Sequence, residues 1–318
     1  MKVFRLHFKT PLHVTSELRG LESAEEIVRS DTLLSALLSL WRRFYDDDPA
    51  DIVDKIRLSS AFPFIGETMY FPRPANLRIS GGGEAGKEKE RKKVEYLSAG
   101  LFKLALEGEV DSRAFNPHNG IFACTPEELP DAEVIPTTLR TRPRVTIDRS
   151  TGESTPFNFS EVEFGPNCGL WFAAELDGVP EERFVAALNL LGDEGLGGDR
   201  SVGMGLFEAS EGNTVLPETS GDGHLILSLF CPSEKELARL DLENSYYRLI
   251  ERGGWITGTS LRRVRTRFFA EGSCFRSNAL LEGRVLKALE KMPELGLHYD
   301  VLRSGRPISV PIKMEGVE

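Results

Sequence analysis

The chain has 318 residues, 40% of them hydrophobic, and a formal net charge of -10. Such a length favours two domains, or one domain with large insertions, and the hydrophobic content excludes general disorder. The negative charge excludes indiscriminate attraction to nucleic acid, so any RNA site has to be a local basic cluster. No apolar run approaches membrane-spanning length and the alternating N-terminus is unlike a signal peptide, so we expect a soluble, cytoplasmic protein without a membrane partner.

Periodicity and capping signals predict the first elements. Residues 2–9 alternate apolar and polar or charged side chains, as in a strand with one buried face. Ser30 can cap a helix that runs to about Phe44, because apolar residues recur in it at helical spacing. Short apolar runs then predict a strand pair at residues 56–62 and 68–71.

The middle of the chain differs from the rest in composition. Residues 73–130 read as an insertion with a glycine-rich tip and a helical stretch around 94–106. Residues 134–165 as a whole are rich in Thr, Arg and Pro and contain a turn at 148–152. With few core residues to bury, this segment is predicted to be a long hairpin that projects from the body.

A glycine-rich segment follows a strand at 170–176 and a helix opened by Pro180. Residues 192–205 contain six glycines in fourteen residues, a density that lets backbone N–H groups approach a phosphate. Arg200 and Ser201 add a positive charge and a hydroxyl. Because the segment follows a helix and precedes a strand, it does not fit a Rossmann or Walker loop. A merely flexible connection is the alternative that the composition leaves open.

The second half repeats a mixture of strands and a helix. A strand is expected at 224–230, followed by a helix from the capping box Ser233–Glu236 to about Ile250. Further strands are expected at residues 255–257, 264–269 and 308–312. The element order predicts an α+β fold of two ferredoxin-like (RRM-like) β-α-β-β-α-β domains, over residues 1–210 and 224–318, joined by a polar linker.

Chemistry-bearing residues are sparse. The cysteines are scattered without a C-x-x-C pair, which favours reduced thiols and excludes a zinc ribbon. No spaced set of carboxylates, histidines or cysteines supplies two ligands or a catalytic pair, so we expect no metal, no cofactor and no enzymatic activity. Three basic clusters remain, at residues 87–93, 140–149 and 261–276.

Several segments, in this order, resemble a family of proteins. They are Leu18–Glu22, Ser30–Leu37, Leu58–Pro63, Phe71–Pro74, the glycine-rich segment, Gly253–Trp255 and Phe269–Phe275. Together they resemble the RAMP superfamily of CRISPR-associated RNA-binding proteins and, more narrowly, the Csm subunit four (Cas-five-like) family of type III-A effector complexes.

The resemblance implies a non-catalytic subunit that binds the repeat-derived 5′ handle of the guide crRNA. It implies two protein partners, the large Cas-ten subunit and an adjacent RAMP backbone subunit, with target RNA met only indirectly in antiviral defence. By matching segment, it implies RNA contacts at Arg19, Gly20, Ser30, Thr32, Gly197, Gly198 and Arg200, and further ones at Arg262, Arg263 and Arg265. The hairpin would be the family's thumb, and its arginines Arg140, Arg142, Arg144 and Arg149 offer bidentate phosphate contacts.

Two alternatives stay open at the level of sequence. Another RAMP paralogue is one, either a type III-B counterpart or a guide-processing endoribonuclease that uses His7 or His13 as acid or base. A protein-interaction module without an RNA role is the other. The carboxylate of Asp199 is expected to pair with the adjacent Arg200.

Overall fold

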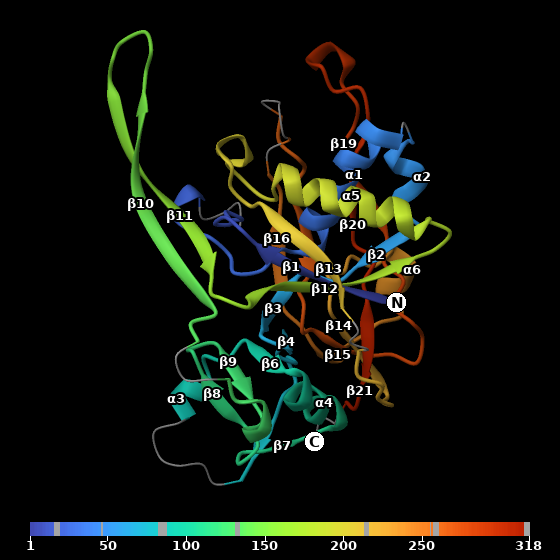
Figure 1. Ribbon diagram of the computed structural model, residues 1–318. Coiled ribbons are helices and arrows are strands. Elements are labelled where there is room, and N and C mark those ends of the chain that lie inside the picture. Colours follow the sequence, from blue (N-terminus) through green and yellow to red (C-terminus); the bar gives the residue numbers. More distant parts are fainter. Residues whose placement is uncertain are drawn as a thin grey trace.

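A nine-stranded sheet runs through the computed structural model, which describes residues 1–15, 20–45, 47–81, 88–130, 134–212, 216–254, 256 and 261–314 (Figure 1). From one edge, its strands are β13 (Phe207–Gly212), β1 (Lys2–Phe8), β12 (Cys168–Leu176), β3 (Phe62–Ile65), β4 (Thr68–Pro72), β6 (Tyr96–Ser98), β9 (Phe122–Cys124) and β8 (Asn116–His118), with β2 (Ile56–Leu58) also paired to β12. The α+β class expected from the sequence is confirmed.

One end of this sheet has the ferredoxin-like arrangement. Strands β13, β1, β12 and β2 lie side by side and each neighbouring pair is antiparallel. Helix α1 (Ser30–Tyr45) and the short α2 (Pro49–Val53) connect β1 to β2, and α5 (Glu181–Glu194) connects β12 to β13. The apolar stripes of α1 and α5 cover one face of the sheet, where Phe4, Leu37 and Leu188 belong to one buried cluster. The predicted strand at 2–9 and the helix beginning at Ser30 are therefore confirmed, but the Ser30 hydroxyl accepts a hydrogen bond from Leu229 N–H instead of capping the helix.

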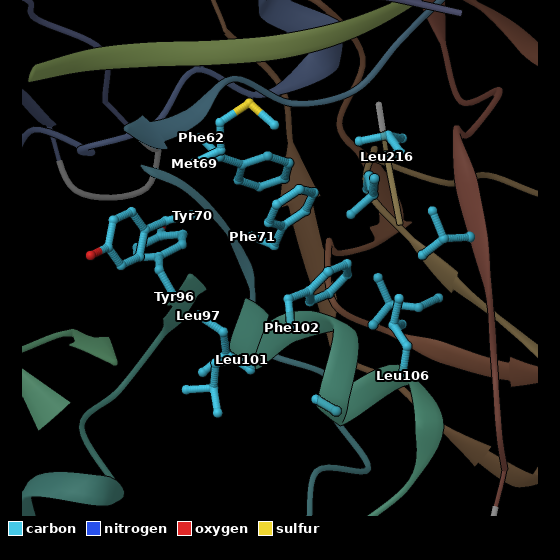
Figure 2. Close-up of a cluster of buried hydrophobic side chains, with 14 of the residues drawn as sticks. Phe62, Met69, Tyr70, Phe71, Tyr96, Leu97, Leu101, Phe102, Leu106 and Leu216 are labelled. Carbon is cyan, nitrogen blue, oxygen red and sulfur yellow. The ribbon is translucent and has the colours of Figure 1, made fainter. Parts of the chain in front are cut away.

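The segment 73–130 is more than a peripheral insertion. Its strands β6, β9 and β8 continue the main sheet, and α4 (Ala99–Glu107) places Phe102 flat on Phe71, with ring centroids 4.4 Å apart (Figure 2). The helix predicted around 94–106 starts later, because Tyr96–Ser98 pairs with β4. The remaining described elements of this segment are β5 (Ile79–Ser80), α3 (Glu88–Arg91), β7 (Val110–Asp111) and a 3-10 turn at Pro126–Glu128. Most of the expected glycine-rich tip lies outside the described residues.

The predicted hairpin is confirmed. Strands β10 (Thr137–Ile147) and β11 (Ser154–Phe164) pair over their full length, and Figure 1 shows the ribbon projecting from the body. The turn is closed by Asp148, whose Oδ1 accepts hydrogen bonds from the N–H groups of Ser150 and Thr151. Residues 145–156 are all exposed, whereas Phe159 near the base is buried.

The second half contains more strand than expected. A four-stranded antiparallel sheet has the order β15 (Asp241–Tyr246), β18 (Cys274–Arg276), β14 (Gly223–Ile226) and β21 (Ser309–Ile312). Two ribbons accompany it, β16 (Leu249–Arg252) with β17 (Thr266–Phe269) and β19 (Val285–Leu289) with β20 (Val301–Ser304). The strands expected at 264–269 and 308–312 are thus present. Of the strand expected at 255–257, only Ile256 lies among the described residues.

The long helix predicted from Ser233 to Ile250 is wrong. The capping box forms as expected, but α6 (Glu234–Leu237) is a single turn. The chain then enters β15 and β16, which pair with β18 and β17. Asp241, Asn244 and Ser245 are poor helix formers that bond to nearby polar groups, and Asn244 N–H donates to the Asp241 carboxylate at 3.1 Å. A capping box marks a helix start and contains no information about its length.

Buried polar contacts join the two halves at the start of α1. The Ser30 hydroxyl accepts a hydrogen bond from Leu229 N–H at 3.0 Å. The buried Asp31 carboxylate pairs with Arg252 at 3.1 Å and with Arg303 at 3.3 Å. The exposed side of the same helix end faces the candidate site.

Candidate nucleic-acid interface

A groove with a cavity volume of about 770 Å³ lies between α1, the glycine-rich segment and the second half. It brings together residues that are as far apart in sequence as Gly20 and Arg265. Eight of the residues predicted to contact RNA line it: Gly20, Thr32, Gly197, Gly198, Arg200, Arg262, Arg263 and Arg265. Arg19 lies outside the described residues.

The groove is richer in positive charge than the chain as a whole. Seven arginines line it against four carboxylates, whereas the chain has a net charge of -10. Each of these carboxylates is paired with a cation: Glu194 with Arg43, Asp199 with Arg144, Glu251 with Arg265, and Asp300 with Lys287. In the described part of the chain, Arg42, Arg200 and Arg263 form no ion pair with a carboxylate. The lining is therefore suited to an anion.

The glycine-rich segment is a packed loop, and the flexible-connection reading is wrong for it. Gly198 N–H donates to the carbonyl of His13 and Gly205 N–H to that of Pro11, each at 2.8 Å. Gly197 has φ +91°, and a Cβ there would clash with the carbonyl oxygen of His13. Glycine is needed at this position because the backbone of residues 13–14 passes against it.

Backbone donors of this loop remain available to a ligand. Asp199 has a left-handed backbone with φ +56°, and a short 3-10 turn follows at Arg200–Val202. Among the described residues, no acceptor is hydrogen-bonded to the consecutive N–H groups of Asp199, Arg200 and Ser201. A left-handed residue followed by right-handed ones aims successive N–H groups into one concavity, the geometry of an anion-binding nest. Ser201 itself is exposed and does not line the groove.

The opposite wall comes from α1 and the second half. Thr32 accepts a hydrogen bond from Arg252 at 2.8 Å, and Arg263 donates to the hydroxyl of Ser35 at 3.2 Å. Ser30, predicted as an RNA contact, is 7% exposed and does not line the groove. Its hydroxyl joins the two halves instead.

The hairpin arginines are not in the groove, and three of them pair with acidic side chains. Register places glutamates of β11 beside them: Arg140 pairs with Glu163 at 2.8 Å and Arg142 with Glu161 at 2.7 Å. Arg144 pairs with Asp199 of the glycine loop. The prediction that Asp199 pairs with Arg200 is therefore wrong, because its partner is Arg144. Arg149 lies in the exposed turn.

Sequence reasoning missed part of the site. Arg42 lines the groove with its guanidinium 4.1 Å from the ring centroid of Tyr299, and Ser35 and Ser39 line it from the same helix. Positions 35, 39 and 42 recur at helical spacing, which was a readable sign of a polar face on α1. Nothing in the sequence placed Tyr299 near them.

Of the two histidines considered for a nuclease, His13 is a packing residue. His13 is 4% exposed, with Nδ1 2.6 Å from the carbonyl oxygen of Ser160 and its ring 4.2 Å from that of Phe159. His7 is half-buried, and burial lowers its pKa. Across the described ranges, no group of three His, Cys, Asp or Glu side chains could bind a metal ion, and no helix there is long and apolar enough to cross a membrane. The four cysteines are free and buried.

Family models match almost the whole chain. The RAMP superfamily model matches residues 5–208, and the model of the CRISPR Csm4 C-terminal domain matches residues 219–312. The chain is 29% identical to the CRISPR system Cms protein Csm4 of Thermococcus onnurineus strain NA1, over 92% of this chain and 94% of that protein. It is 24% identical to the protein of the same name from Mycobacterium tuberculosis strain H37Rv, over 91% of both.

Solved structures share the fold. The chain superposes with a TM-score of 0.69 on a chain of the Csm3–Csm4 subcomplex in the type III-A CRISPR-Cas interference complex, at 20% identity and over 98% of this chain and 99% of that one. A chain of the Csm1–Csm4 cassette in complex with cA4 gives a TM-score of 0.62 at 22% identity, over 99% and 98%. The chain therefore belongs to the RAMP superfamily and, within it, to the Csm4 family.

Proposed function

We propose that this chain is a non-catalytic, RNA-binding subunit of a type III-A Csm effector complex, and that its groove binds the 5′ handle of the guide crRNA. The observation that supports this most is the groove itself. Three distant segments bring arginines and backbone N–H groups to one surface of an otherwise acidic protein. Such groups bind phosphates and position a strand without reading its bases.

The partners follow from the same family membership. Similar chains are found in a Csm3–Csm4 subcomplex and in a Csm1–Csm4 cassette. We propose that this chain likewise contacts a large Cas-ten-type subunit and an adjacent RAMP backbone subunit, meets target RNA only through them, and works in the cytoplasm. The acidic surface outside the groove suits protein partners better than RNA.

RNA binding by the groove can be measured with a fluorescein-labelled repeat RNA. Replacing Arg200 and Arg265 together with alanine should weaken binding at low salt about tenfold or more. The slope of log K against log salt should become shallower by about 0.7 for each phosphate that the variant no longer neutralises. Arg113→Ala is the matched control, because Arg113 is exposed, lies outside the groove and pairs with Asp111.

The alternatives give different results in the same assay. Cleavage of the repeat RNA that is abolished by His7→Ala or by His13→Ala, in a variant that still binds the RNA, would favour a guide-processing nuclease. No RNA binding at low salt, alone or with the large subunit, would leave the protein-interaction hypothesis. An unchanged salt slope in the double variant would remove the groove from the proposal. Co-purification with mass spectrometry of bound proteins and RNA tests the partners.

A further inference from the structure

One carboxylate in the arginine-lined groove is paired differently from the others. Glu194, Glu251 and Asp300 pair with cations of the helices and ribbons beside them. Asp199, in the centre of the glycine loop, pairs instead with Arg144 of the hairpin strand β10. Both side chains of this pair are about one-third exposed, at 35% and 34%. A negative charge beside backbone N–H donors opposes anion binding. The position of Asp199 in the groove therefore indicates a role other than contact with the anion.

A chain of contacts leads from this ion pair into the base of the hairpin. The guanidinium of Arg144 lies 3.7 Å from the ring centroid of Phe159, which is 1% exposed. A further neighbour of Phe159 is the His13 ring, whose Nδ1 is 2.6 Å from the Ser160 carbonyl oxygen. The His13 carbonyl in turn accepts the N–H of Gly198, one residue before Asp199. Two routes, one ionic and one through His13, therefore connect the loop with the hairpin.

The loop conformation depends on such support. Asp199 has a left-handed backbone, which a residue with a Cβ adopts at a cost and keeps only where its surroundings impose it. The carbonyl of Asp199 accepts the N–H groups of Val202 and Met204, so the 3-10 turn starts from this residue. Any rotation at Asp199 would redirect the N–H groups of Arg200 and Ser201 together.

We propose that Asp199 is a positioning residue: its ion pair with Arg144 fixes the glycine loop against the hairpin, so that the N–H groups of Asp199 and Arg200 and the Arg200 side chain face the groove as one preformed phosphate site. The inference rests on the proposed RNA-binding function of the groove. It also predicts that the orientation of the hairpin and the affinity of the groove are coupled, since both depend on the same contact.

For the substitution Asp199→Asn, loss of the charge and loss of the positioning contact predict opposite changes in RNA affinity. Removing a carboxylate from an anion-binding groove should tighten RNA binding by about two- to threefold at low salt. If Asp199 positions the loop, Asp199→Asn should instead weaken binding about five- to tenfold. Asparagine has the same shape and tolerates the left-handed backbone, so this variant keeps the local conformation accessible.

The experiment titrates a fluorescein-labelled single-stranded oligoribonucleotide with wild type, D199N, and E194Q as the matched control. Glu194 is a second carboxylate of the same groove, but its partner Arg43 is exposed and belongs to α1. E194Q should therefore bind more tightly and D199N less tightly. Binding by D199N that equals or exceeds that of wild type overturns the proposal.

Two further measurements distinguish a failure of the positioning role of Asp199 from a failure of the proposed RNA-binding function of the groove. In a double-mutant cycle, Arg144→Met and D199N should be strongly non-additive, whereas Arg144→Met and E194Q should be additive. Hydrogen exchange in the RNA-free protein should show faster exchange of Gly198 N–H and of the hairpin base in D199N, and no change in E194Q. Unchanged exchange overturns the positioning role. Faster exchange in a protein that binds no RNA supports the contact and overturns the proposed function instead.

Discussion

At the scale of single residues, two aspartates that each pair with arginine, Asp31 and Asp111, show how burial decides what an ion pair contributes to stability. Burial alone would raise the pKa of Asp31, but Arg252 and Arg303 outweigh that effect and lower it to about 2. The hydrogen bonds of Arg113 also lower the pKa of Asp111 to about 2, although this pair is on the surface. The same pKa therefore arises in two environments with different consequences for stability.

Asp31→Asn should destabilise the protein by about 3–5 kcal/mol at neutral pH, because it leaves two buried guanidinium groups without their counter-charge. The lowered pKa means that the Asp31 contribution is complete above pH 3.8 and is lost as the pH falls towards 2. Urea unfolding across this range measures both effects, and the variant should show a weaker pH dependence than wild type.

The exposed pair provides the control for this measurement. Asp111→Asn changes the same charge but acts at a solvated, screened site, so the unfolding midpoint should stay within error of wild type. Equal destabilisation by both substitutions would contradict the role assigned to burial.

At the scale of elements, the hairpin is a ribbon whose stability comes from its base. Phe159 and Val162 of β11 are buried there, whereas β10 exposes Leu139, Val145 and Ile147 by more than half of their surface. The far part of the ribbon therefore contributes little to the core and is available for partners. Arg140 and Arg142 pair with glutamates across the strands, so they stabilise register as well as offering charge.

Shortening the hairpin should leave the fold intact. Val145 and Pro156 face each other in the register, so an Asn-Gly turn can replace residues 146–155. We expect a change of less than about 1 kcal/mol in unfolding free energy, since all of the removed residues are exposed. Phe159→Ala should cost about 3–5 kcal/mol in the same assay. A large loss of stability on shortening would show that the tip packs against the body.

At the scale of the whole molecule, the hydrophobic core extends across the expected domain boundary. Phe102 of α4 belongs to the same buried cluster as Leu225 and Val310 of the second half. Lys313 N–H also donates to the carbonyl of Leu106 at 2.9 Å. The segment 73–130 thus joins the two halves, and Figure 2 shows Phe102 of this segment in the middle of the cluster, beside Phe71.

Phe102→Ala should destabilise the entire chain by about 3–5 kcal/mol. Tryptophan fluorescence and far-UV circular dichroism should report one coincident urea transition, because the cluster is shared. Lys103→Ala, on the exposed face of the same helix, should leave the transition unchanged. Two separate transitions would indicate halves that unfold independently.

Much of the first half could be predicted from the sequence, since its elements depend on local signals. Strand β1 follows from alternation, α1 from apolar spacing, and the hairpin from an arginine- and threonine-rich run that is followed by a turn. The prediction of a long helix after Ser233 was wrong because it also relied on a local signal alone. Its capping box is local, whereas the pairing of β15 with β18 depends on residues that lie about 30 positions later.

By itself, the sequence determined that this is an α+β chain with an acidic surface, a projecting hairpin and a glycine-rich loop between a helix and a strand. Only the tertiary structure decided which arginines share a groove, that Arg144 pairs with Asp199, and that Ser30 is buried. The physical reason is that periodicity and capping act over a few residues. The groove and its charge balance arise from side chains that long-range packing brings together, about which local patterns contain no information.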